Sequence, residues 1–333
     1  MSNTMLEGKV AIVTGAGRGI GRSHALCLAR HGAAVLVNDL GSSITGTGAE
    51  AGPAEAVTQE IVAAGGMALA DMTDIADWAS ARLLVERTLA AFGRIDILVN
   101  NAGITQYGSI ETETAEGWHR TLAVNLTGSA AMMHWAARHW AAEGPAAGRA
   151  IINTASPAGT NPPPGATSYC VSKAGVIALT VATATELAHL GVRVNALAPM
   201  ARTRMTQAVP KLDDIMRPPK RGADRMAPEN VSTVMLYLAS PACRFTGRIF
   251  GVDGDDVYLF NGMSAEHHLS NGGEIWDQGR LSEALMAFDP QDHGFMIAPS
   301  LHVRGATPSQ KVLDVFAQIE RGKPVTPLWA PLT

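Results

Sequence analysis

The sequence predicts an α/β fold in which a doubly wound, seven-stranded parallel sheet carries helices on both faces and is followed by a C-terminal extension. Short β-branched runs alternate with longer alanine-rich helical stretches through the first two-thirds of the 333 residues, a pattern typical of parallel sheets with right-handed crossovers. The runs are continuously apolar, as expected when both faces of a sheet are covered. Apolar residues make up 47% of the chain and charged residues 17%, which allows a large core and excludes wholesale disorder.

Seven strands are expected, separated by segments of 15 or more residues with helical periodicity. The predicted strands cover residues 9–14, 33–38, 67–70, 95–100, 150–153, 192–198 and 249–252. Residues 41–53 are rich in Gly, Ser and Thr and predict a long loop after the second strand.

The chain divides into a main domain, residues 1–255, and an extension, residues 256–333, in which the strand–helix alternation stops. One helix is expected in the extension, with Thr307 as N-cap, Pro308 at the first position and Gly322 as its end. We expect the extension to pack on the same domain or on a neighbouring subunit.

Charge and cysteine content exclude several classes of protein. Basic residues number 26 and acidic residues 30, so a nucleic-acid-binding surface is not expected. Three cysteines cannot form a disulfide framework, which favours a reducing compartment. The N-terminus lacks a signal-peptide pattern and no apolar run approaches membrane-spanning length. We therefore expect a soluble cytoplasmic protein without a membrane partner.

A glycine-rich turn, TGAGRGIG at residues 14–21, joins the first predicted strand to the first predicted helix. Glycine lets the backbone turn sharply and brings N–H groups close to a pyrophosphate at a helix N-terminus. The position between strand and helix makes this signal stronger than the glycines alone. It predicts a Rossmann-type dinucleotide site formed by Gly15, Gly17, Arg18, Gly19, Ile20 and Gly21.

Asp39 ends the second predicted strand, 24 positions after Gly15. A carboxylate at this position can accept hydrogen bonds from both hydroxyls of an adenosine ribose and repels a 2′-phosphate, so NAD is favoured over NADP. The alternative is a solvated turn residue. Arg18 is a counter-signal, because its guanidinium could hold a 2′-phosphate.

Ser156, Tyr169 and Lys173 are the candidate proton-transfer residues. The spacing of four residues places the Tyr169 phenol and the Lys173 ammonium on one face of a helix. A tyrosine base needs its pKa to fall by roughly 3 units, about 4 kcal/mol. One cation at ~4 Å in an effective dielectric of ~20 supplies about that much, and an oxidised nicotinamide adds positive charge. Ser156 follows the fifth strand and can hold the substrate oxygen.

Together these motifs resemble the short-chain dehydrogenase/reductase family over roughly residues 6–255. The resemblance rests on the glycine turn, NNAG at 100–103, VNLTG at 124–128, Ser156 in NTASPAG, the Tyr169–Lys173 pair and Ala198-Pro199. It implies that Asn125 completes a catalytic tetrad by anchoring a water in a proton relay through Lys173, which also holds the nicotinamide ribose.

The resemblance also implies further cofactor contacts. Asn101, Ala102 and Gly103 would line the adenosine side, Asp71 would meet the adenine, Pro199 would border the site and Thr203 would meet the nicotinamide carboxamide. This chain has Pro199-Met200 where the family usually has Pro-Gly, which leaves the geometry of that loop open.

A narrower resemblance is to the (3R)-hydroxyacyl-CoA dehydrogenase part of the multifunctional enzymes of β-oxidation. It rests on VNDLG at 37–41, NALAP at 195–199, TRMT at 203–206 and the extension. A segment at about 200–228 is expected to cover the substrate. Its interleaved Arg, Lys and Met residues suit an acyl chain on a phosphate-bearing carrier, or are solvated charges offset by nearby acids.

Three alternatives remain open at this point. A hydroxysteroid or other bulky hydrophobic alcohol would also suit an apolar pocket. Reduction of a 3-oxoacyl group on a carrier protein is less favoured, because Asp39 disfavours NADPH. A non-catalytic NAD-binding regulator is the remaining possibility.

No metal site is predicted. Residues His267, His268, Asp289, Asp292 and His293 match no tetrahedral ligand spacing. The resemblance implies a homodimer or homotetramer built on the helices near residues 130–142 and after Tyr169, with Trp135 and Trp140 at an interface or in the core.

Overall fold

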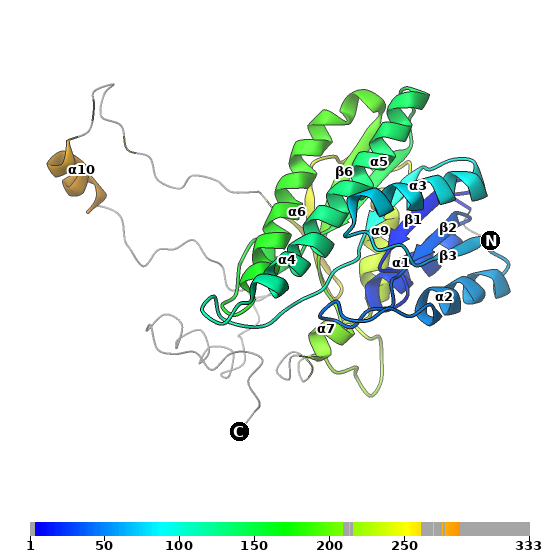
Figure 1. The fold of residues 1–333 in the computed structure, drawn as a ribbon, viewed down its shortest axis with the longest axis horizontal. Coiled ribbons are helices and arrows are strands. Elements are labelled where there is room, and N and C mark those ends of the chain that lie inside the picture. Colours follow the sequence, from blue (N-terminus) through cyan, green and yellow to red (C-terminus); the bar gives the residue numbers. More distant parts are fainter. Residues whose placement is uncertain are drawn as a thin grey trace.

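A computed structural model describes residues 4–208, 213, 216–260, 269, 275 and 277–286. Its centre is an eight-stranded sheet with the order β3-β2-β1-β4-β5-β6-β7-β8 (Figure 1). The strands are β1 (Val10–Thr14), β2 (Ala34–Asn38), β3 (Ala68–Asp71), β4 (Ile97–Asn100), β5 (Arg149–Thr154), β6 (Val192–Met200), β7 (Ile249–Asp253) and β8 (Asp256–Leu259). Strands β1 to β7 are parallel to their neighbours, whereas β8 runs antiparallel to β7.

The seven predicted parallel strands are confirmed, but the sheet has an eighth strand that the sequence did not reveal. β8 returns along β7 after a tight turn at Gly254, whose φ is +61°. It is an edge strand with Val257 and Leu259 exposed, so it lacks the apolar run of a buried strand. Its Tyr258 ring lies against Gly251, where an added Cβ would come within 2.0 Å of the ring.

Helices cover both faces of the sheet (Figure 1). One face carries α1 (Gly19–Arg30), α2 (Gly52–Ala63) and α9 (Pro228–Ala239), packed over a core that includes Val35, Leu197 and Met235. The other carries α3 (Trp78–Phe92), α5 (Gly128–Glu143) and α6 (Thr167–Glu186). Burial of both faces explains the continuously apolar strands.

The helix α4 (Ala115–Leu122) continues through a π-helical turn, η1 (Ala123–Thr127), into α5. Within α5, Trp140 is fully buried and donates its indole N–H to the Ile95 carbonyl at 2.8 Å. Trp135 is only partly buried and donates to the carbonyl of Trp78. Trp140 therefore belongs to the core; the sequence analysis had left open whether it lies there or at a subunit interface.

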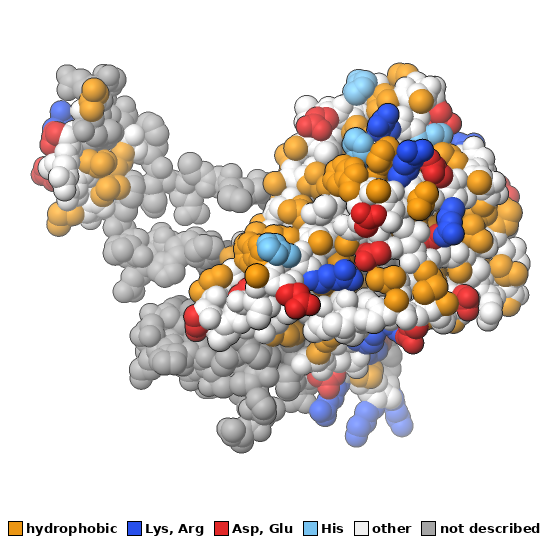
Figure 2. Space-filling view, in the orientation of Figure 1, with side chains coloured by type: hydrophobic (Ala, Val, Ile, Leu, Met, Phe, Trp, Pro, Cys, Tyr) orange, Lys and Arg blue, Asp and Glu red, His pale blue; other side chains and the backbone are white. Residues whose placement is uncertain are grey.

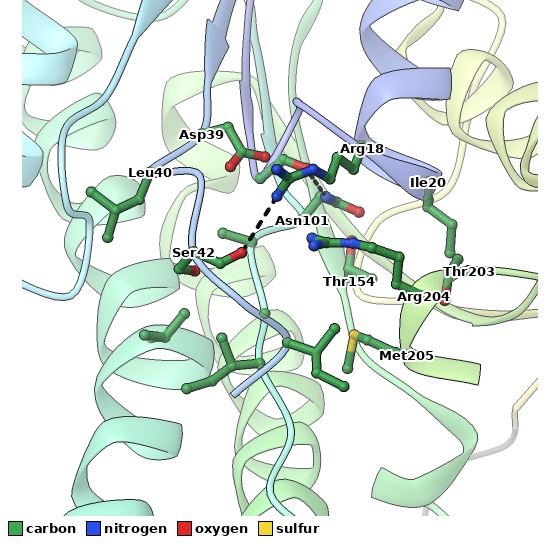
Figure 3. Close-up of a pocket in the computed structure, with 18 of the residues that line it drawn as sticks. Arg18, Ile20, Asp39, Leu40, Ser42, Asn101, Thr154, Thr203, Arg204 and Met205 are labelled. Carbon is green, nitrogen blue, oxygen red and sulfur yellow. Dashed lines mark hydrogen bonds between the residues drawn. The ribbon is translucent and has the colours of Figure 1, made fainter. Parts of the chain in front are cut away.

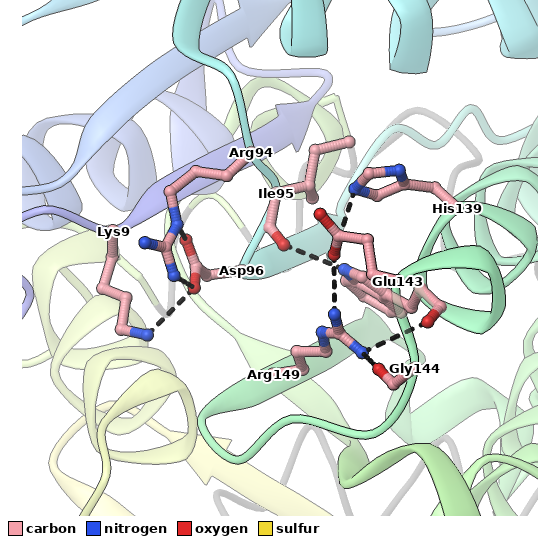
Figure 4. A network of polar contacts seen from close by, with 9 residues as sticks. Lys9, Arg94, Ile95, Asp96, His139, Glu143, Gly144 and Arg149 are labelled. Carbon is pink, nitrogen blue, oxygen red and sulfur yellow. Dashed lines mark hydrogen bonds and ion pairs between the residues drawn. The ribbon is translucent and has the colours of Figure 1, made fainter.

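A polar network holds the amino-terminal edge of the sheet (Figure 4). The buried carboxylate of Asp96 accepts hydrogen bonds from Lys9 Nζ at 2.9 Å, from Arg94 Nε at 2.8 Å and from the Val10 N–H at 3.0 Å. Burial acts to raise the pKa of Asp96, but these donors hold it below its usual value. The network joins the start of β1 to the start of β4 and leaves the opposite edge of the sheet for binding.

At the carboxyl edge, β1 and β4 are neighbours although β2 and β3 lie between them in the chain. Such a reversal of strand order opens a crevice between the chain segments that leave the two strands, and ligands of open α/β sheets bind there. The glycine turn leaves β1 and the Asn101–Gly103 segment leaves β4, so the fold brings these two motifs together.

In the extension the structure describes a short helix, α10 (Gln278–Leu285), which was not predicted. The helix predicted after Thr307 and the five His and Asp residues weighed as metal ligands lie outside the described residues. Among the described residues, no helix is long and apolar enough to cross a bilayer. The same part of the chain contains no cluster of three or more His, Cys, Asp or Glu arranged to hold a metal ion.

Candidate active site

Two glycines of the turn, Gly15 and Gly21, have no room for a side chain. Gly15 has a φ of +63°, and a Cβ added there would lie 2.6 Å from the Ala102 Cα. A Cβ at Gly21 would lie 2.1 Å from the Gly15 carbonyl oxygen. The glycines therefore serve packing between the turn, α1 and the segment after β4, in addition to the sharp turn expected from the sequence.

Asp39 is held in place by the turn itself. Its carboxylate accepts hydrogen bonds from the N–H groups of Gly17 and Gly41, both at 2.7 Å. The carboxylate lines the cleft next to Arg18 (Figure 3). It is therefore an oriented acceptor at the end of β2.

The predicted loop after β2 folds over the cleft. The carbonyl of Ile44 accepts from the Thr105 N–H at 2.9 Å, and the carbonyl of Gly46 accepts from Arg120 at 3.2 Å. Ser42, Ser43 and Ile44 consequently line the cleft. Composition predicted the loop, but only these tertiary contacts bring it to the site.

Tyr169 and Lys173 lie one helical turn apart on α6 and both line the same cleft as the glycine turn. Lys173 is buried, its Nζ lies 5.7 Å from the centre of the Tyr169 ring, and it donates to the Thr154 carbonyl at 2.8 Å. Ser156 begins the short helix η2 (Pro157–Gly159), and its hydroxyl interacts with the Tyr169 phenol.

Lys173 does not produce the lowering of the Tyr169 pKa that the sequence analysis assigned to it. Burial raises the pKa of Tyr169 to about 12, against a smaller lowering by the Ser156 hydroxyl. Burial also lowers the pKa of Lys173 to about 8, so its positive charge is itself disfavoured. Sequence spacing placed the two groups correctly on one helical face, but it could not include the cost of burying both.

Asn125 occupies the π-helical turn η1 and is fully buried. Its side chain accepts from the Ile104 N–H at 2.8 Å, and donates to the Ile104 carbonyl and to the Ser172 hydroxyl, both at 3.0 Å. Its own carbonyl accepts from the Ser129 hydroxyl at 2.9 Å. Asn125 thus fixes the segment after β4 to the helix that carries Tyr169 and Lys173.

Asp71 ends β3 and its carboxylate is fully engaged by protein groups. It accepts from Asn38 at 3.0 Å, from the Thr73 N–H at 2.6 Å and from Arg87 at 2.7 Å. Burial acts to raise the pKa of Asp71, but these hydrogen bonds hold it below its usual value. The next residues, Thr73 and Asp74, line the cleft in its place.

The segment that follows β6 forms another wall. β6 runs through Pro199 and Met200, so the departure from Pro-Gly extends the strand, and Met200 pairs with Asp253. Thr203 then caps α7 (Arg204–Gln207), accepting from the Thr206 N–H. This places Thr203 beside the glycine turn, since a Cβ added at Gly19 would lie 3.4 Å from its methyl group.

Most of the predicted site residues meet at this one cleft (Figure 3). The cleft is lined by Gly15, Arg18, Gly19, Ile20, Gly21, Asp39, Asn101, Ala102, Gly103, Tyr169, Lys173, Pro199 and Thr203. Four predicted residues do not line it: Gly17 and Asn125 support its walls, Ser156 reaches it through Tyr169, and Asp71 faces protein partners.

Sequence reasoning missed several residues at the cleft, among them Leu40, Ser42, Ile44, Thr73, Asp74 and Arg120. It also missed Tyr107, in the loop after β4, whose hydroxyl donates to the Met205 carbonyl at 3.4 Å. Tyr107 is close enough to contribute to the raised pKa of Tyr169. Leu40, Thr73 and Asp74 had a signal in the sequence, since they follow predicted strands at the binding edge.

The residues present fit a dinucleotide. Helix geometry leaves the first N–H groups of α1 without partners inside the helix, and the residues that carry them, Gly19, Ile20 and Gly21, line the cleft. At one end the Asp39 carboxylate is oriented to accept from hydroxyls, and at the other end lie Tyr169 and Lys173. The cleft thus joins a turn suited to bind an anion to a phenol suited to exchange a proton.

Comparison with known proteins agrees with this geometry. The family model for short chain dehydrogenase matches residues 9–213. The hydroxyacyl-CoA dehydrogenase ChsB1 of Mycobacterium tuberculosis is 36% identical over 297 residues, which cover 85% of this chain and 89% of that protein.

Two further relatives bear on the substrate class. A 3-oxoacyl-[acyl-carrier-protein] reductase of Synechocystis is 40% identical over 260 residues, covering 76% of this chain and 99% of that protein. The peroxisomal multifunctional enzyme type 2 of Drosophila melanogaster is 37% identical over 246 residues, 72% of this chain but 38% of that longer protein. The resemblance to enzymes of β-oxidation predicted from the sequence is confirmed.

Proposed function

The chain belongs to the short-chain dehydrogenase family and is an oxidoreductase acting on CH–OH groups; within it we propose an NAD-dependent (3R)-hydroxyacyl-CoA dehydrogenase. The observation that carries this proposal is that Tyr169 and Lys173 share one cleft with the glycine turn and Asp39. A proton-transfer group and a dinucleotide-binding turn are the two parts that such an oxidoreductase requires.

A bound nicotinamide cofactor would supply hydride transfer to or from the carbon that carries the substrate oxygen. Tyr169 exchanges the proton of the substrate oxygen, and the Ser156 hydroxyl holds that oxygen. Because burial raises the pKa of Tyr169 to about 12, the phenol is protonated near neutrality and suited to donate to a forming alkoxide. Alcohol oxidation requires positive charge beside the phenol to favour its deprotonated form.

Asp39 supports NAD as the cofactor. Its carboxylate is oriented by Gly17 and Gly41 at the end of β2, where it can accept from both hydroxyls of an adenosine ribose. The same charge disfavours a 2′-phosphate. Gly15, Gly19, Ile20 and Gly21 would hold the pyrophosphate, and Lys173 and Thr203 would hold the nicotinamide half.

The segment 200–228 supports an acyl thioester as the substrate. The described part of this segment exposes Arg217, Lys220 and Arg221. Figure 2 shows Lys and Arg side chains gathered at the lower edge of the molecule, where Figure 1 draws the chain beyond α7. Such cations suit the phosphates of coenzyme A. In the same segment, Arg202 and Arg225 form ion pairs with Asp224 and Asp255.

A second candidate is reduction of a 3-oxoacyl group on a carrier protein. It is favoured by the identity of 40% to a reductase of that name over nearly its whole length. Both activities interconvert a hydroxyl and a ketone on the β-carbon of the acyl group, and they differ in the carrier and in the cofactor. The Asp39 carboxylate favours the first candidate, because it disfavours the 2′-phosphate of NADPH.

The proposal is tested with the purified full-length chain and purified thioesters. Formation of NADH is measured by absorbance with (3R)- and (3S)-3-hydroxyacyl-CoA, with a hydroxysteroid and with a simple cyclic alcohol. Oxidation of NADH and NADPH is measured with 3-oxoacyl-CoA and with the same acyl group on carrier protein. We expect the highest kcat/KM for (3R)-hydroxyacyl-CoA with NAD. A higher value for the carrier-bound substrate with NADPH would overturn the proposal in favour of the second candidate.

A further inference from the structure

Arg204 is the first residue of α7, and its side chain extends into the cleft toward Arg18 (Figure 3). It directly follows Thr203, which adjoins Gly19 of the glycine turn. The sequence analysis assigned Arg204 no role at the cofactor and included it only among the cations of the segment 200–228.

The cations of the described cleft are Arg18, Arg120, Lys173 and Arg204. The first three each donate to a carboxylate or carbonyl group of the protein. In the described part of the chain, Arg204 has no acceptor within hydrogen-bond distance and no carboxylate within ion-pair distance. Its five N–H donors are therefore available to a ligand.

The surroundings of Arg204 favour an added anion. Partial burial and the neighbouring Arg18 lower the pKa of Arg204, and the charges of Asp39 and Glu50 act against them. Arg18 itself is paired with Glu50. The guanidinium of Arg204 is thus a cation beside another cation, and an anion between it and the turn would relieve that repulsion.

We propose that Arg204 binds the pyrophosphate of the dinucleotide from α7, while the first N–H groups of α1 bind it from the glycine turn; the inference rests on the cofactor site proposed above. A guanidinium can donate two parallel hydrogen bonds to phosphate oxygens, which adds direction to the charge.

A 2′-phosphate is the other anion that a nicotinamide dinucleotide could offer. The structure favours the pyrophosphate, because Asp39 and Glu50 place two carboxylates near the expected position of the adenosine ribose. Arg204 instead follows the residue that touches Gly19, at the N-terminus of α1.

Three nucleotides separate these possibilities without requiring turnover. Dissociation constants of adenosine, ADP and 2′-AMP are measured by isothermal titration calorimetry for the wild-type chain, Arg204→Gln and Arg204→Lys. The matched control is Arg22→Gln, which removes the same charge from α1, where Arg22 pairs with Glu60 away from the cleft. Binding of NAD is measured in parallel.

Loss of a charge-assisted hydrogen-bond pair predicts that Arg204→Gln weakens ADP and NAD at least about 10-fold, with adenosine within about 2-fold. Arg204→Lys should lie between the two, and Arg22→Gln should match the wild type. Equal ADP affinity in Arg204→Gln, an equal loss for adenosine, or a loss confined to 2′-AMP would each overturn the inference.

The two proposals can fail separately. If the chain binds ADP through Arg204 but oxidises no hydroxyacyl-CoA, the inference holds and the proposed substrate is wrong. If hydroxyacyl-CoA is oxidised and Arg204→Gln binds ADP normally, the proposed function holds and the role of Arg204 is wrong.

Discussion

Glu50 forms an ion pair with Arg18, so a residue of the loop after β2 engages the guanidinium that stands in the glycine turn. The sequence left Arg18 as a counter-signal to NAD, because an unpaired arginine at this position could hold a 2′-phosphate. The pair removes much of that capacity and adds a carboxylate near Asp39. Two carboxylates therefore bear on cofactor preference where the sequence identified one.

Glu50→Gln is expected to shift cofactor preference toward NADP. The substitution removes one negative charge and leaves Arg18 free to donate to a 2′-phosphate. We therefore expect the ratio of kcat/KM for NADP to that for NAD to rise about 5-fold. This is less than a full charge-assisted hydrogen bond would give, because the ion pair is exposed. Glu60→Gln is the control, since it removes a carboxylate of α2 that pairs with Arg22 of α1. An unchanged ratio would show that the ion pair does not influence the choice.

Asp39→Ser should raise the same ratio at least about 10-fold, because it removes both the repulsion of a 2′-phosphate and the acceptor for the ribose hydroxyls. Asp39 also accepts from Gly17 and Gly41, so part of any loss with NAD can come from the turn. Asp39→Asn separates the effects by keeping an acceptor and removing the charge. If neither variant moves the preference, another group sets it.

Tyr169→Phe should lower turnover at least about 100-fold, since it removes the exchangeable proton from the site. NAD should bind with its wild-type dissociation constant, which calorimetry can measure. Tyr237→Phe on α9 removes a phenol outside the cleft and should keep full activity. Wild-type turnover by Tyr169→Phe would remove the basis of the proposed mechanism.

Burial of His24 is expected to lower the free energy of unfolding at acid pH. It is fully buried between α1 and α9, where its Nδ1 lies 2.8 Å from the Ser232 hydroxyl, and burial lowers its pKa to about 3. Between pH 6.5 and about 3 the unfolded chain binds a proton at this residue that the folded chain does not. The free energy of unfolding therefore falls with falling pH, by up to about 1.4 kcal/mol per pH unit from this group.

Urea unfolding at several pH values tests this expectation by comparing the wild type with His24→Gln. In this pH range the free energy of unfolding of the variant should depend less steeply on pH, by the contribution of one proton. This holds whatever the stability of the variant near neutrality. Ser232→Ala removes the hydrogen-bond partner but keeps the imidazole buried, so its slope should remain that of the wild type. Parallel curves for wild type and His24→Gln would contradict the assignment.

The order of the strands could be predicted from the sequence, because burial of both sheet faces requires continuous apolar runs. The glycine turn could be predicted as well, because a close backbone contact requires glycine. The glycine turn, Asp39 and the Tyr169–Lys173 pair could be recognised in the sequence, because each motif depends on neighbours within a few residues. β8 could not be predicted from an apolar run, because an exposed edge strand does not require one.

The tertiary structure alone decided which distant groups meet. The pairing of Arg18 with Glu50, the reach of the loop after β2 to Thr105, the partners of Asp71 and the position of Arg204 depend on contacts between separate segments. The same holds for the pKa values of Tyr169 and Lys173, because the free energy of burying a charge is set by everything packed around it. Local pattern determined the parts of this protein, whereas the packing of those parts determined their charges and partners.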